Sequence, residues 1–226
     1  MIFYKRIVVS IITLLTVSFF SIGGCDIDFG TSDGSSGSSE LESIEGTVIN
    51  VIPTADIEGI AVDVTDPDNR LNISSAVTSS SGFFKVTGAF IGIPTVEFCD
   101  QTFEFCDQAD QSLGLINVTV YDDSRIQLGN IRLENGVVIL DDSTIITFEG
   151  NVALDGNNCN NNVGTITVET LDRDTDVILQ ISSSTDVLDK NNDDISCQDF
   201  LNGNRIETRG ILLLGNTVDA FRIQFK

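Results

Sequence analysis

Two cysteines lie in a stretch that nearly repeats itself, VEFCDQTFEFCDQADQ, residues 96–111. At this spacing Cys99 and Cys106 could bind a soft metal, form a redox pair or close a structural disulfide. A zinc site uses four thiolate or imidazole ligands, and the chain has no histidine. A redox pair is typically Cys-x-x-Cys at a helix start, which is a shorter spacing. The stretch therefore favours a structural disulfide that closes a hairpin.

A second candidate chemistry is calcium binding by oxygen ligands. Asp189, Asn191 and Asp193 follow the D-x-N-x-D spacing with which a calcium loop begins. Asp194 stands where such a loop usually has glycine, and Phe200 stands where it has a bidentate glutamate. Asp and Asn also gather in solvated turns. The alternatives are thus a Ca²⁺ site and a polar turn, and we expect no other cofactor.

The charge and composition of the chain exclude whole classes of function. Its 12 Lys and Arg face 34 Asp and Glu, which gives a net charge of −22. Phosphate backbones are bound mainly through Lys and Arg, so we expect no nucleic-acid partner. The lack of histidine excludes Ser-His-Asp and Cys-His mechanisms. No two acids stand out as a glycosidase pair. We therefore expect a protein that is not an enzyme.

The first residues are typical of an export signal. Lys5 and Arg6 precede an apolar run over residues 7–20, which is shorter than the roughly 20 residues of a membrane span. The run leads into Ile22-Gly23-Gly24-Cys25, which resembles the lipobox of bacterial lipoproteins. A cysteine that follows the signal by chance is the alternative.

The lipobox resemblance implies a location and an anchor. In that family the cysteine thiol receives diacylglycerol, the signal is cut before it, and the new amino group is acylated, here with palmitate as the expected chain. The resemblance thus implies a signal peptide at residues 1–24, lipidation of Cys25, and a membrane-anchored protein of the bacterial cell envelope that faces the periplasm or the exterior. Asp26 resembles an inner-membrane retention signal. Removal of the signal would leave the chain two units more negative than −22.

The cysteine count fits that compartment. With Cys25 lipidated, the four others form an even set in an oxidising space, which indicates two disulfides. The count alone allows three pairings.

The remaining chain predicts a tether and then strands. Residues 25–42 hold the anchor and a Gly/Ser-rich linker, which behaves as a flexible coil. From Ser43 onward, apolar and polar residues alternate with period two, which indicates half-buried strands. Clear examples are residues 47–52, 60–65, 116–121 and 126–133, the last with a bulge at Gly129-Asn130. No stretch has helical periodicity, so the expected fold class is all-β.

The first half of the strand region resembles a known module. IEGTV at 44–48, IEGIAVDV at 57–64, TSSSGFFKV at 78–86 and IQLGNIRL at 126–133 resemble the carboxypeptidase regulatory-like domain. The resemblance implies a prealbumin-like Greek-key β-sandwich over residues 43–135. The chain departs from the family at Ser79, where aspartate is usual, and in the cysteine-bearing stretch.

The second half is similar to an uncharacterised family of small β-barrel modules in bacterial lipoproteins. The similarity rests on FEGNV at 148–152, GTITV at 164–168, SSTDV at 183–187, GNRIETRG at 203–210 and NTVDAFRIQF at 216–225. It implies an OB-like barrel over residues 143–226 and no known activity. The division into two modules favours the disulfides Cys99–Cys106 and Cys159–Cys197.

These patterns together predict a non-enzymatic envelope lipoprotein. Its lipid anchor fixes it to the membrane, and its two β modules serve as a scaffold or a binding surface for an envelope protein or a glycan. The alternative is a calcium-dependent adhesion or carbohydrate-binding lipoprotein.

Overall fold

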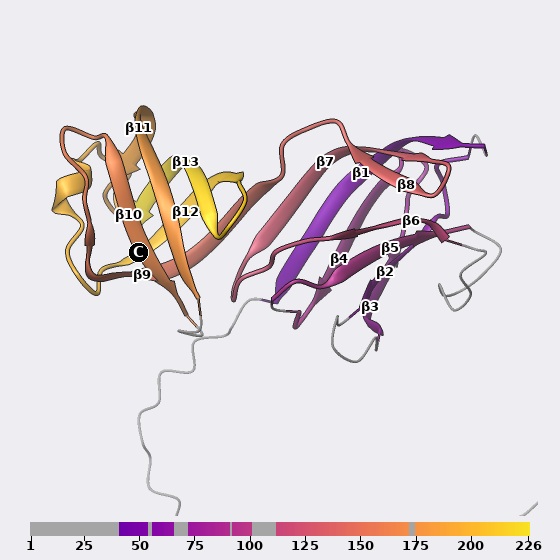
Figure 1. Ribbon diagram of the computed structural model, residues 1–226, viewed down its shortest axis with the longest axis horizontal. Helices are drawn as coiled ribbons and strands as arrows, with labels where there is room; N and C mark the ends of the chain where they lie inside the picture. Colours follow the sequence, from indigo (N-terminus) through magenta and orange to yellow (C-terminus); the bar gives the residue numbers. More distant parts are fainter. Residues whose placement is uncertain (1–40, 54–55, 66–71, 91, 101–111, 172–174) are drawn as a thin grey trace, which may run out of the picture. The chain divides into compact units, whose positions relative to one another are not determined.

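The described part of the chain folds almost entirely into β-strands (Figure 1). The computed structural model describes residues 41–53, 56–65, 72–90, 92–100, 112–171 and 175–226. In these ranges the one helical element is a 3-10 turn, η1 (Cys197–Asp199), and no helix is long and apolar enough to cross a membrane. The predicted all-β fold is confirmed. The strands are β1 (Glu42–Ile52), β2 (Ala61–Thr65), β3 (Asn72–Val77), β4 (Phe83–Gly88), β5 (Thr95–Cys99), β6 (Ser112–Asn117), β7 (Arg125–Glu134), β8 (Val137–Leu140), β9 (Ile145–Asn157), β10 (Gly164–Thr170), β11 (Asp176–Leu188), β12 (Arg205–Leu212) and β13 (Thr217–Phe225).

Strands β1 to β8 form a sandwich of two sheets. One is the β4-β1-β7 end of a nine-stranded sheet that continues through β9, with β8 also paired to β7, and the other has the order β3-β2-β5-β6. Neighbours are antiparallel except β1 and β7, which run parallel. The inner faces share a core in which Phe84 of β4 and Phe98 of β5 pack edge to face, with ring centroids 5.5 Å apart. Two packed sheets are thus present, as the sequence predicted for this half, whereas their prealbumin-like Greek-key assignment stays a prediction.

Strand β7 shows how the sequence pattern selects the inner face. Its apolar side chains, spaced at two, three and two residues, are all buried: Ile126, Leu128, Ile131 and Leu133. The register against β1 shifts between the second and the third of them, where Gly129 has a φ of +69°. An extra residue on one strand restores the inward direction of the side chains that follow it. The bulge predicted at Gly129-Asn130 is therefore confirmed.

The strand predicted at residues 116–121 ends earlier than expected. Strand β6 runs from Ser112 and pairs with β5 only as far as Asn117. Beyond it, an isolated bridge between Gly92 and Val120 continues the pairing in the described residues. Pro94 precedes β5 and has no N–H to donate, and its carbonyl accepts a hydrogen bond from the Val118 N–H at 3.1 Å. The ladder is interrupted there, although Val118 and Val120 are buried as their alternation indicates.

The turn before β4 brings a glycine against β1. Gly82 has a φ of +77°, its N–H donates to the Ser79 carbonyl at 2.8 Å, and its carbonyl accepts from the Val48 N–H at 2.9 Å. A Cβ at this position would lie 1.9 Å from the Val48 carbonyl oxygen. Only glycine combines this φ with so close a backbone contact.

Strands β9 to β13 close into a barrel. The order is β10-β11-β13-β12-β9, and β9 pairs with β10 to complete the ring. Neighbours are antiparallel except β11 and β13, which run parallel. The five strands therefore enclose one small barrel, whereas its OB-like assignment stays a prediction. The small barrel expected after the sandwich is thus present.

Sandwich and barrel belong to one compact unit, Ser38–Lys226. Residues 125–127 of β7 pair with residues 145–147 of β9, and the later part of β7 pairs with β8. Strand β8 falls in residues 136–142, which the sequence assigned to neither module, and it extends the sandwich beyond residue 135. Strand β1 begins at Glu42, one residue before the predicted start.

Candidate functional site

The predicted lipidation residue lies outside the described residues. Cys25, with the signal and most of the linker, falls in residues 1–40, and Cys106 falls in residues 101–111. Lipid attachment and the Cys99–Cys106 pairing therefore stay predictions. Cys99 itself ends β5, is fully buried and is disulfide-bonded. A buried, bonded cysteine has a structural role and is not a reactive thiol.

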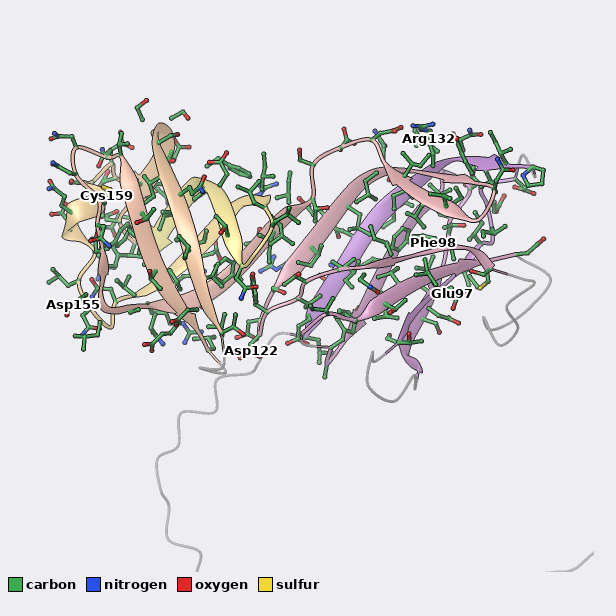
Figure 2. The ribbon with its side chains drawn as sticks, in the orientation of Figure 1. Glu97, Phe98, Asp122, Arg132, Asp155 and Cys159 are labelled. Atoms are coloured by element: carbon green, nitrogen blue, oxygen red, sulfur yellow. A yellow bond between two sulfur atoms is a disulfide. The ribbon has the colours of Figure 1, made fainter. Side chains whose placement is uncertain are left out.

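The second predicted disulfide, Cys159–Cys197, is confirmed. It joins the loop after β9 to η1, with a Cα–Cα distance of 6.0 Å, and Figure 2 labels Cys159 at this end of the barrel. Asn157 Nδ2 donates to the carbonyls of Cys197 and Phe200, both at 2.8 Å. The Cys197 N–H donates to Asn162 Oδ1 at 2.9 Å. The asparagine-rich loop between β9 and β10, residues 158–163, is thus held to the barrel by one disulfide and several amide hydrogen bonds.

The predicted calcium loop is a turn organised by Asp189. Its Oδ1 accepts from the N–H groups of Asn191 at 2.7 Å and Asp193 at 2.9 Å, and its Oδ2 accepts from Asn191 Nδ2 at 3.1 Å. The N–H bonds from Asp193 and Asn191 hold the pKa of the Asp189 carboxyl below its usual value. Both oxygens are therefore engaged within the turn, and calcium binding by Asp189, Asn191 and Asp193 stays a prediction.

The candidate binding site is a groove of about 510 Å³. Two phenylalanine rings line it, Phe83 of β4 and Phe221 of β13, with 45% and 37% of their surface exposed. Ile145 of β9 and Ile211 of β12 add apolar wall. Ligand sites combine concave apolar walls with a few placed polar groups. This groove offers the walls, and its polar groups come from β1, β7 and the segment before β9.

One polar group of the groove, Asp142, is fixed by the bulge of β7. Its Oδ2 accepts from the Asn130 N–H at 2.9 Å. Its Cβ lies over Gly129, where an added side-chain carbon would come within 2.7 Å. The same bulge that keeps the β7 side chains facing inward thus also positions a carboxylate in the groove.

A second polar group, Gln127, is held from both sides. Its Nε2 donates to Glu45 Oε1 at 2.8 Å, and its Oε1 accepts from Arg209 Nη2 at 3.3 Å. The Arg209 guanidinium also lies 5.5 Å from the centre of the Phe221 ring, within range of a cation–π contact. Arg209 therefore orients one amide and one ring of the groove at the same time.

Sequence reasoning did not find this groove. Phe83 and Phe84 are neighbours on one strand, so one ring must face outward, and Phe84 takes the buried face with 1% exposure. An aromatic residue in the exposed phase of an alternating strand is the local signal that could have pointed to it. The approach of Phe83 and Phe221 depends on the whole fold, which no local pattern encodes.

Comparison with known proteins assigns the chain to no family. No family model matches the chain, and no curated protein matches it. Among solved structures, a 9R-lipoxygenase from Cyanothece PCC8801 is similar over 41% of this chain, at 14% identity and a TM-score of 0.32. The chain spans 16% of the length of that lipoxygenase chain. A likeness this low carries no argument about function.

Proposed function

We propose that the protein is a non-enzymatic envelope lipoprotein that displays its two β modules to a partner at a membrane surface. The observation that carries the proposal is the sequence Ile22-Gly23-Gly24-Cys25 after an apolar run. A Gly/Ser-rich stretch follows, and the first strand of the described residues begins at Glu42. Acyl chains on Cys25 anchor the chain durably, because several chains together bind a membrane far better than one. The Gly/Ser-rich stretch gives the modules reach.

Three properties of the chain support this proposal, one each on catalysis, on the partner and on the compartment. It has no histidine, which removes the commonest general base. Its net charge of −22 repels phosphate backbones, so the partner is an envelope protein or a glycan and not a nucleic acid. The Cys159–Cys197 disulfide is typical of an oxidising compartment.

The lipid anchor is tested by metabolic labelling with an alkyne fatty acid in a bacterial host. We expect the wild-type chain to be labelled and to sediment with membranes, and an inhibitor of the lipoprotein signal peptidase to leave a larger precursor. The Cys25→Ser variant should be unlabelled, and Cys99→Ser is the matched control that keeps the label. Asp26 predicts retention in the inner membrane, so after separation of the two membranes we expect the chain in the inner-membrane fraction. A wild-type chain that takes up no label would overturn the anchor.

The display role is tested by photo-crosslinking in intact cells. A photoreactive residue in place of Phe83 in the groove should capture one defined envelope component, and the same residue in place of Leu115, which is 56% exposed on β6, is the control. Equal capture from both positions, or recovery of the uncrosslinked chain alone, would count against a partner at the groove.

A carbohydrate ligand is the second candidate, because the groove pairs two exposed rings with an amide and a carboxylate. Aromatic rings cover the apolar face of a sugar, while amide and carboxylate oxygens accept hydrogen bonds from its hydroxyls. On a glycan array, we expect binding to fall in Phe83→Ala and Phe221→Ala and to persist in the control Leu214→Ala. The same array is repeated in a chelator, and loss of binding there would show that glycan binding depends on calcium. A blank array for the wild-type protein removes this candidate.

A further inference from the structure

We propose that Glu42, Asp122 and Asp123 form a Ca²⁺ site at the start of β1. One carboxylate oxygen from each residue lies within 4.8 Å of the other two. Calcium binds oxygen ligands at about 2.3–2.6 Å, so two opposite Ca–O bonds span about 4.8 Å. A single calcium ion can therefore contact all three carboxylates without a large movement of the chain. Figure 2 labels Asp122.

A buried and unpartnered oxygen gives independent support for a ligand here. Glu42 is 4% exposed, and its Oε1 accepts from the Asp123 N–H at 3.3 Å. Its Oε2 is buried and has no hydrogen-bond partner among the described residues. A buried charged oxygen without a partner is costly, and such a group in a native fold needs an explanation. A bound cation supplies one, because it coordinates the oxygen that hydrogen bonding leaves unsatisfied.

The backbone holds the three carboxylates together by its own hydrogen bonds. The Ser124 N–H donates to the Tyr121 carbonyl at 3.2 Å, and the Tyr121 N–H donates to Ser124 Oγ at 3.1 Å. The Ser43 N–H donates to the Ser124 carbonyl at 3.1 Å, which ties this turn to β1. Asp123 has a φ of +54°, a conformation that aspartate tolerates better than most residues. The site is thus preorganised by bonds that need no ion.

The chemistry of the ligands selects a hard cation. Carboxylate oxygens favour Ca²⁺, Mg²⁺ and Mn²⁺ over metals that prefer thiolate or imidazole. Magnesium needs near-ideal octahedral geometry at about 2.0–2.1 Å, so a spread of up to 4.8 Å suits the larger calcium ion. Arg125 follows two residues after Asp123 and lines a pocket with it. One guanidinium can neutralise one carboxylate, which leaves two negative charges for the ion.

Terbium luminescence tests the site on the full chain. Tb³⁺ binds calcium sites and emits when a nearby tyrosine absorbs ultraviolet light. The chain has no tryptophan and two tyrosines, Tyr4 and Tyr121, and the second lies directly beside Asp122. We expect emission that Ca²⁺ displaces more readily than Mg²⁺. Tyr121→Phe should abolish the emission while Ca²⁺ still raises the melting temperature.

Two variants distinguish this site from the rest of the acidic surface. Glu42→Gln and Asp122→Asn should each raise the dissociation constant for Tb³⁺ by about tenfold or more, because calcium affinity depends on ligand charge. Asp189→Asn is the matched control, and it should leave the constant unchanged. Loss of binding in Asp189→Asn with retention in Glu42→Gln would overturn the proposal.

The melting temperature separates a metal ligand from a merely structural carboxylate. In a chelator, Glu42→Gln should melt at or above the wild-type temperature, because removal of a charge relieves repulsion within the cluster. With calcium added, the wild type should gain stability through binding, and Glu42→Gln should gain less. Asp122→Asn repeats the measurement in case Glu42→Gln fails to fold. A wild-type melting temperature that is the same in chelator and in millimolar calcium contradicts the proposal.

Discussion

Two cations share the Glu149 carboxylate on the surface of the barrel. Arg205 Nη2 lies 2.8 Å from Oε2, and Lys226 Nζ lies 3.0 Å from Oε1. Lys226 also reaches Glu207 at 2.7 Å. Burial alone would raise the pKa of Glu149, but hydrogen bonds from Lys226 and Arg205 outweigh it and hold that pKa below its ordinary value of 4.5. A carboxyl whose pKa is lower in the folded state stabilises the folded state at pH values above its ordinary pKa. The contribution is lost as pH falls through the folded pKa.

The Lys226→Met variant tests the ion pair between Lys226 and Glu149. Near neutral pH we expect the free energy of unfolding to drop by about 0.5–1 kcal/mol, a modest loss because the pair is partly exposed and screened. Well below pH 4.5 the loss should shrink, since Glu149 is then protonated. Urea unfolding at the two pH values measures both. Lys85→Met is the control, because Lys85 lies 3.8 Å from Glu45 and should contribute less. An equal loss at both pH values would argue against the charge pair.

At the scale of the element, the turn before β4 depends on one glycine. For Gly82→Ala we expect a loss of about 2–3 kcal/mol, because the substitution combines a φ of +77° with a collision against the Val48 carbonyl. Gly136→Ala is a matched control, since Gly136 has a φ of +82° and nothing within 4 Å of the added carbon. It should cost about 1 kcal/mol, the strain alone. Chemical denaturation gives both values, and equal losses would show that the contact with β1 adds nothing.

The Cys159–Cys197 disulfide closes a loop with a sequence separation of 38. By the chain-entropy model, its removal in a Cys159→Ala, Cys197→Ala double variant should cost up to about 4 kcal/mol, because the unfolded chain becomes less restricted. Asn160→Ala lies in the same loop and should change the stability little. Differential scanning calorimetry compares the two. A double variant that melts with the wild type would mean that the barrel does not depend on this link.

Local sequence patterns predicted the strands, but they could not predict the contacts between residues that are far apart in the chain. The bulge at Gly129 was predictable because burial on a strand follows a period of two, and the slip in that period is visible in the sequence. Strand β8 was missed, although Asn135-Gly136 is a strong hairpin signal and both residues have positive φ. The meeting of Glu42 with Asp122 was not predictable, because residues eighty positions apart approach only once the sandwich has formed.

At the scale of the whole molecule, charge repulsion opposes the compact state. The net charge is −22 without histidine, so repulsion is spread over the surface near neutral pH. We expect the melting temperature to rise as salt increases from about 0.01 M to about 1 M, over which the screening length falls from about 30 Å to about 3 Å. The measurement is made in a chelator, with choline chloride as the control for specific sodium binding. A melting temperature that does not change with either salt would show that repulsion is unimportant.

The position of β1 in its sheet has a mechanical consequence. This strand is the first in the described residues and lies between β4, with which it pairs from Glu42 to Thr47, and β7, with which it pairs from Ser43 to Ile52. Hydrogen bonds run perpendicular to the strands in the antiparallel pair β1–β4, and they cross at a slant in the parallel pair β1–β7. A pull on the N-terminal end of β1, along its axis, would therefore load two rows of bonds in shear at once instead of opening them one after another. A chain held by its N-terminus against flow or drag would transmit the force into the part of the sandwich best able to resist it.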